Sequence, residues 1–144
     1  MSDETALETA EAKKAVFRQL IDVYALGDVT TLEQLCHPDY KGHTAAGDRD
    51  LAVFRQSILN FHAIFEYGPG AFVIEDQFVE GDKVATRMTA HVKMRETGAP
   101  ATMIGINLAI IRGGRIIEEW NTWELLQSPG EGDTAVRGSL STWG

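Results

Sequence analysis

The chain has 144 residues, 44% of them hydrophobic and 24% charged, which is enough for one domain with a hydrophobic core and too few for two. Its 13 Lys and Arg against 21 Asp and Glu give a formal charge of −8, which disfavours binding to nucleic acids and to anionic membrane surfaces. The single cysteine excludes an internal disulfide framework and a cysteine-based zinc cluster. Neither a signal peptide nor an apolar run of the roughly 20 residues that span a bilayer is found, so we expect a cytoplasmic protein.

The first predicted helix lies in the opening segment, where apolar residues recur at intervals that place them on one stripe. Thr5 and Glu8 have the spacing of a capping box at its start, and Gly27 is expected to end it. The apolar stripe consists of Val16, Phe17, Leu20, Ile21 and Tyr24.

Two more helices are predicted before residue 66. Thr30 and Glu33 repeat the capping-box spacing ahead of a short helix that cannot continue into Pro38. A brief extended piece over 40–44 and a loop follow. The third helix has the clearest helical periodicity in the chain, carried by Leu51, Phe54, Ile58, Phe61 and Phe65.

After a Gly-Pro-Gly turn at 68–70 the apolar residues alternate with a period of two. The pattern predicts four strands, 71–79, 84–95, 101–112 and 115–126, with turns so short that neighbours must be antiparallel. Helices followed by such a meander predict a single α+β domain over 1–127, with the helices covering one face of the sheet. Residues 128–144, rich in Gly, Ser and Asp, are expected to form a flexible tail.

Strand alternation also assigns the two faces of the sheet. In 84–94 the even-numbered residues, Met88 among them, form the inner set. In 102–111 both sets are apolar, so we expect the outer face to be covered as well, by a second copy of the chain. The outer set is Ile104, Ile106, Leu108 and Ile110.

Four segments, in this order, resemble the SnoaL-like polyketide cyclases of the NTF2-like superfamily. They are His37-Pro38-Asp39-Tyr40, Glu80 to Val84 with Arg87, Gly105-Ile106-Asn107 leading into Ile110-Ile111-Arg112, and Gly114 to Glu124. The resemblance implies a cone in which a curved antiparallel sheet wraps around three helices and leaves an apolar pocket open at one end. It also implies a homodimer through the backs of the sheets.

The resemblance implies cofactor-independent acid/base chemistry on a polyketide-like or other hydrophobic carbonyl compound. In that family an Asp of the last strand acts with a His of the preceding strand, and here Asn121 and Asn107 occupy those positions. An amide cannot exchange protons at neutral pH, although it can donate a hydrogen bond to a carbonyl oxygen. If the pocket is catalytic, the proton-transfer group must be another residue.

Two residues are candidates for that group. The resemblance places His43 at the entrance to the cone, where related enzymes such as ketosteroid isomerases keep a proton-transfer residue, and imidazole suits neutral pH. The alternative is a histidine in a surface loop. Glu119 shares the inward parity of Asn121, and an apolar pocket would raise the pKa of its carboxyl group. Its alternative is a carboxylate that reaches solvent or an arginine.

We predict a mechanism in which His43 accepts the proton while Asn107 and Asn121 hold the substrate oxygen. The predicted ligand contacts are Tyr24, Phe61, His62, Met88, Met103 and Trp123. His62 has the alternative of a partly buried, hydrogen-bonded helix histidine, and Trp123 that of a core residue. No metal is expected, because His37, His43, His62 and His91 lack the spacing of metal ligands.

Three functions stay open at this point. The first is a cofactor-independent cyclase or isomerase that acts on a small hydrophobic carbonyl compound. The second is an epoxide hydrolase or cyclase, for which the sequence offers Glu119 but no identified inward Asp partner. The third is a non-catalytic small-molecule binding or accessory protein, which the two Asn replacements favour because a fold does not settle function.

Overall fold

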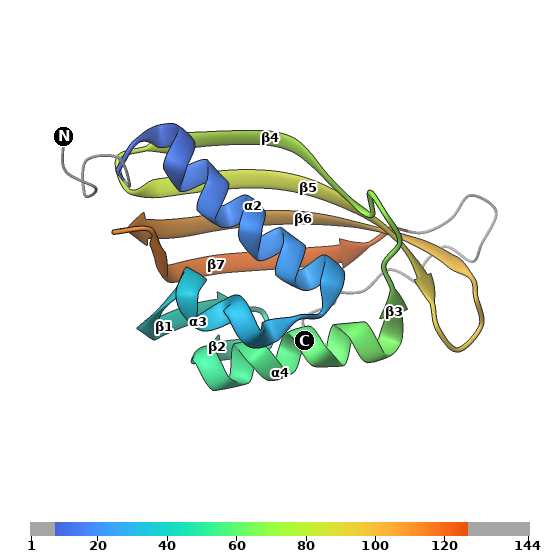
Figure 1. Ribbon diagram of the computed structural model, residues 1–144. Coiled ribbons are helices and arrows are strands. Elements are labelled where there is room, and N and C mark those ends of the chain that lie inside the picture. Colours follow the sequence, from blue (N-terminus) through green and yellow to red (C-terminus); the bar gives the residue numbers. More distant parts are fainter. Residues whose placement is uncertain (1–7, 127–144) are drawn as a thin grey trace.

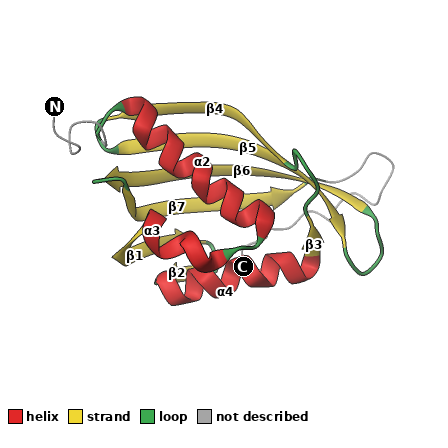
Figure 2. Cartoon of the chain, in the orientation of Figure 1, coloured by secondary structure: helices red, strands yellow, loops and turns green. Residues whose placement is uncertain are grey.

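Residues 8–126 are described by the structure, a computed structural model, as three α-helices, one short 3-10 helix and a seven-stranded sheet (Figure 1). The order is helical at first and then mostly strand, which confirms the predicted α+β class (Figure 2). Within the described part, no helix is long and apolar enough to cross a membrane. The predicted tail over 128–144 lies outside the described residues.

Helix α2 (Ala10–Leu26) begins and ends at residues that satisfy its free backbone groups. The Thr9 hydroxyl accepts the Ala12 N–H (3.1 Å), while the predicted cap Thr5 lies outside the described residues. Gly27 ends the helix as predicted, with a left-handed φ of 70° and its N–H donated to the Val23 carbonyl (2.8 Å). The predicted apolar stripe is buried in the core.

The next two helices are α3 (Leu32–Leu35), which follows the 3-10 helix η1 (Val29–Thr31), and α4 (Leu51–Ile64). The capping pair predicted at Thr30 is wrong, because Asp28 accepts the Thr30 N–H (3.0 Å) and caps η1 instead. Asp50 caps α4 through the Val53 N–H (2.9 Å), and the buried Phe54, Ile58 and Phe61 confirm its apolar periodicity. The last predicted member of the stripe, Phe65, is wrong, because the helix ends at Ile64 and Phe65 begins the strand β3.

The seven strands form one mixed sheet. They are β1 (Cys36–Thr44), β2 (Gly47–Arg49), β3 (Phe65–Glu66), β4 (Phe72–Glu80), β5 (Lys83–Met94), β6 (Pro100–Arg112) and β7 (Arg115–Leu125). The predicted meander β4–β7 is antiparallel throughout. The expectation of a purely antiparallel sheet is wrong, because β1 pairs with β7 in parallel. Short turns constrain only consecutive strands, whereas β1 and β7 are separated by most of the chain.

Helix α2 crosses the face of β4–β7, and α4 lies beside β1 and β2, so the inner face of the curved sheet is covered (Figure 1). The predicted inner parity of β5 is confirmed by the burial of Val84, Met88 and Val92. On β7 strict alternation from the inward Glu119 would also turn Ile117 inward, but Ile117 is only half-buried. A bulge opposite Ile110 and Ile111 puts Ile116 in the core in its place.

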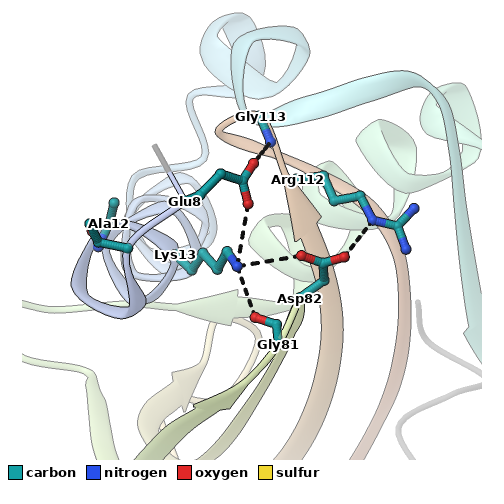
Figure 3. A network of polar contacts seen from close by, with 8 residues as sticks. Glu8, Ala12, Lys13, Gly81, Asp82, Arg112 and Gly113 are labelled. Carbon is teal, nitrogen blue, oxygen red and sulfur yellow. Dashed lines mark hydrogen bonds and ion pairs between the residues drawn. The ribbon is translucent and has the colours of Figure 1, made fainter. Parts of the chain in front are cut away.

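A polar network around the buried Lys13 connects the start of α2 to the β4–β5 and β6–β7 turns (Figure 3). Lys13 Nζ donates to the Gly81 carbonyl (2.8 Å) and contacts Glu8 (3.3 Å) and Asp82 (3.4 Å). Asp82 also accepts a bond from Arg112 Nε (2.6 Å), and Glu8 accepts a backbone N–H from the β6–β7 turn (2.8 Å). A buried ammonium group needs such partners, so the network anchors α2 across the sheet.

Candidate functional site

An ion pair lies buried on the inner face, where the end of β2 and the strand β7 flank β1. Arg49 Nη2 donates to Glu119 Oε1 (3.1 Å), and the two residues are only 6% and 1% exposed. Arg49 Nε donates to the Tyr40 hydroxyl (3.2 Å), and the guanidinium carbon lies 4.0 Å from the centre of the Phe54 ring. Gly42 makes room for this arrangement, because a Cβ there would lie 2.8 Å from Arg49 Nε.

Four buried polar atoms around this ion pair make no hydrogen bond of ordinary geometry to any residue within 8–126. They are Tyr24 Oη, Asn107 Oδ1, Glu119 Oε2 and Asn121 Oδ1. Asn107 and Asn121 are directly paired on β6 and β7, and Asn121 follows Glu119 by two residues on the same face. Buried polar atoms are normally satisfied, so this group of four marks a place suited to a polar part of a ligand.

Burial sets the protonation behaviour of the cluster. Removal from water raises the pKa of Glu119, although Arg49, Tyr40 and Asn107 act to lower it. Burial also raises the pKa of Tyr24 to about 12, so its phenol stays protonated at neutral pH. Burial disfavours the Arg49 cation, but Tyr24, Tyr40 and Glu119 raise its pKa overall, and it stays charged. The cluster thus combines a carboxyl group of raised pKa, a hydroxyl donor and a fixed cation.

A small apolar cavity adjoins the polar cluster and shares Tyr24 with it. Its volume is about 10 Å³, close to the space that one water molecule needs. Trp123 forms one wall and lies flat against Gly105, where a Cβ would come within 2.7 Å of its ring. A larger ligand therefore requires movement of the lining residues, which are Tyr24, Phe61, Tyr67, Phe72, Met103 and Trp123.

Most of the predicted site residues meet in this interior. Asn107, Asn121 and Glu119 belong to the polar cluster, and four predicted ligand contacts line the cavity. Met88 is buried in the core beneath the site, outside the cavity lining. His62 supports the site from behind, because its Nε2 contacts the Tyr24 carbonyl oxygen (2.6 Å). This agrees with its alternative assignment as a hydrogen-bonded helix histidine.

His43 lies apart from the other candidates, on the outer face of the sheet. Its neighbour Gly42 faces inward, so the alternation of β1 turns His43 outward. The ring nitrogens contact Asp48 Oδ1 (2.8 Å) and Glu118 Oε2 (2.6 Å), and the ring stacks on Trp120 with centroids 5.0 Å apart. The expected position at the entrance to the cone is therefore not observed.

Among residues 8–126, no group of three or more His, Cys, Asp or Glu side chains is arranged to hold a metal ion.

A family model for the SnoaL-like domain matches residues 17–119. The chain belongs to this family. Among curated proteins, no sequence matches it.

Solved structures share the fold of this SnoaL-like domain. IdmH of Streptomyces antibioticus, described as "a putative polyketide cyclase", is 24% identical with a TM-score of 0.64, over 77% of this chain and 91% of that one. AclR of Streptomyces galilaeus, "a putative hydroxylase", is 14% identical with a TM-score of 0.68, over 80% of each chain. An NTF2-like protein of Burkholderia xenovorans is 11% identical with a TM-score of 0.64, over 81% and 92%. At these identities the matches establish the NTF2-like fold.

Sequence reasoning missed two members of the polar cluster in this SnoaL-like domain, Arg49 and the hydroxyl of Tyr40. An inward carboxylate at Glu119 implies a buried cation, and an arginine was one of its expected partners. The sequence did not show which arginine, because Arg49 reaches Glu119 only through the parallel pairing of β1 with β7.

Proposed function

We propose that this SnoaL-like domain is an enzyme that transfers a proton at the carbon next to a carbonyl group of a small hydrophobic compound. Aldol-type cyclisation and isomerisation both begin with such a step. The observation that carries the proposal is the group of four unpartnered buried polar atoms beside an aromatic-lined cavity. No metal or organic cofactor takes part in the proposed step.

Glu119 is the proposed proton-transfer residue. Arg49 binds one carboxylate oxygen, Oε1, whereas Oε2 makes no hydrogen bond of ordinary geometry to residues 8–126, although Tyr40 and Asn107 lie near the carboxylate. Oε2 can therefore accept a proton from the substrate carbon and return it to another atom of the product. The raised pKa of this carboxyl group makes the Glu119 carboxylate a stronger base for removing a proton from the substrate carbon. His43, on the outer face, has no such access to the interior.

Tyr24 is the proposed donor to the substrate oxygen. When Glu119 takes the proton, the electron pair moves onto the carbonyl oxygen, and a donor fixed beforehand stabilises that negative charge. Tyr24 Oη is buried and protonated, lies near Arg49, and makes no hydrogen bond of ordinary geometry within residues 8–126, and its ring also lines the cavity. The amides of Asn107 and Asn121 can bind a second oxygen of the substrate. A compound with an apolar ring and two neighbouring oxygens fits these features.

The test is deuterium exchange from D2O into aromatic and alicyclic β-keto compounds, followed by NMR. We expect Glu119→Gln to slow exchange about 10²–10⁴-fold, as for loss of a general base, and Tyr24→Phe about 10²–10³-fold. Glu124→Gln, which changes an exposed carboxylate on the same strand, serves as the control and should keep the wild-type rate. Full exchange by folded Glu119→Gln would refute the role of Glu119, and loss of exchange in His43→Ala alone would favour the histidine.

Ligand binding without catalysis is the second candidate. The observation in its favour is that amides replace both acid/base positions of the family while Arg49 already pairs with Glu119. Saturable binding of the same compounds without deuterium exchange would support it. Epoxide opening is less well supported, because Glu119 is the one fully buried carboxylate in the described part of the chain.

We also propose that two copies of the chain associate through the outer face of the sheet. Large apolar side chains are exposed there on β4, β6 and β7, and a group of such side chains on one face is typical of an interface. The patch comprises Val73, Phe78, Ile104, Ile106, Leu108 and Trp120.

A further inference from the structure

The junction between the β1–β2 hairpin and β7 is tied on both faces of the sheet. On the outer face His43 contacts Asp48 of β2 and Glu118 of β7. On the inner face Arg49 of β2 bonds to Glu119 of β7. Asp48 and Arg49 are consecutive residues, and so are Glu118 and Glu119, so the two ties hold the same pair of backbone segments.

The backbone alone holds β2 weakly. This strand has three residues, lies at the edge of the sheet and, among the described strands, pairs only with β1. Arg49 must reach across β1, over Gly42, to meet Glu119. The position of its guanidinium therefore depends on how firmly side chains hold the hairpin against β7.

The outer tie requires a charged histidine. A neutral imidazole has one N–H donor and one acceptor, so only the imidazolium form can donate to both Asp48 and Glu118. The hydrogen bond to Glu118 makes the largest contribution to raising the pKa of His43, and the hydrogen bond to Asp48 makes the next largest. The side chain is 25% exposed, so it can exchange protons with water. Its stacking on Trp120 also favours a cation.

We propose that His43 is a positioning residue, whose imidazolium form holds the β1–β2 hairpin against β7 and thereby fixes Arg49 against Glu119. Loss of the ring proton breaks one of the two outer bonds, loosens the hairpin and shifts the Arg49 guanidinium. This inference rests on the proposed function in one respect. Its consequence for catalysis, a pH-dependent arrangement of Arg49 and Glu119, matters only if Glu119 transfers the proton.

The groups that face His43 among the described residues come from three strands. They are Asp48 from β2, Glu118 and the neutral Trp120 from β7, and Lys41 from β1, which is paired in register with Glu118. Of these side-chain types, only imidazole ordinarily changes its charge between pH 5 and 8. A transition in that range or just above it is therefore assigned to His43.

The experiment follows the Nε–H signal of Arg49 by ¹⁵N NMR in the wild type between pH 6 and 9, beside the ring signals of His43. We expect the Arg49 chemical shift to change with the same midpoint as the His43 ring. In His43→Gln, which keeps a hydrogen bond but cannot titrate, this change should vanish. In His43→Ala at pH 6, exchange of the Arg49 Nε–H with water should be about tenfold faster than in the wild type.

His91→Ala is the matched control, because it removes an exposed histidine from the same sheet and should leave the Arg49 signal unchanged. If the Arg49 chemical shift in the wild type did not change at the midpoint of the His43 ring titration, that result alone would overturn the inference. Unchanged Arg49 exchange in folded His43→Ala would also overturn it. Neither readout needs a substrate, so failure here leaves the role of Glu119 to be decided by the deuterium exchange test.

Discussion

Replacing Arg49 with Met removes the partner of a buried carboxylate while it keeps much of the apolar volume of the side chain. The variant loses the bond to Glu119 (3.1 Å), the bond to Tyr40 (3.2 Å) and the contact with the Phe54 ring (4.0 Å). Breaking a buried ion pair from one side costs about 3–5 kcal/mol, because the remaining charge is left unpaired. Packing of Met on the ring offsets part of the lost ring contact.

We therefore expect the free energy of unfolding of Arg49→Met to fall by about 4 kcal/mol. In a domain of this size that corresponds to a drop in Tm of about 12–20 °C. The double variant with Glu119→Gln should recover about half of the loss, because no buried charge then remains unpaired. Urea unfolding followed by tryptophan fluorescence measures the wild type, the two single variants and the double variant.

The matched control is Arg55→Met, which breaks a surface pair with Glu33 (2.5 Å) on the helices, away from the proposed dimer face, and should cost at most about 1 kcal/mol. If Arg49→Met cost no more than this control, the Arg49–Glu119 pair would not be buried and coupled as described. Full additivity of the two inner substitutions would likewise contradict the direct contact between them.

Three further predictions follow from separate features. Gly105→Ala forces the Trp123 ring to move, and we expect a loss of about 1–3 kcal/mol with a shifted fluorescence maximum; an unchanged spectrum would contradict the contact. Ile106→Asp should convert a wild-type dimer into monomers by light scattering, and a monomeric wild type would refute the proposed interface. Because the folded-state pKa of His43 is raised, its stabilisation is complete below the unfolded pKa of about 6.5 and is lost as pH rises through the folded value. Urea midpoints should show this loss in the wild type and not in His43→Ala.

Local patterns in the sequence were sufficient to predict the helices and the meander. The helical spacing of α4, the glycine at the end of α2 and the alternation of β5 each depend on residues close together in the chain. The parallel pairing of β1 with β7 was not predicted, because it joins segments far apart in sequence and leaves no local pattern. The bulge that moved Ile117 out of the core also has no local signal in this sequence.

The candidate site was predicted in part for the same reason. Strand alternation, combined with the resemblance that chose the inward set of the last strand, placed Asn107, Asn121 and Glu119 on the inner face. It could not place His43, whose direction depends on the register of the irregular strand β1. Arg49 was missed because its bond to Glu119 forms only when β1 of the hairpin pairs with β7.

A crystal structure of the protein with a naphthol would test the proposed site most directly. The phenolic oxygen of such a compound resembles an enolate, and its fused rings match the aromatic lining of the cavity. We predict electron density for the ligand in the interior, with its oxygen within hydrogen-bond distance of Tyr24 Oη and a ring carbon facing Glu119 Oε2. Trp123 or another lining residue should be displaced to make room. A ligand ordered only on the outer face, with the interior unchanged, would contradict it.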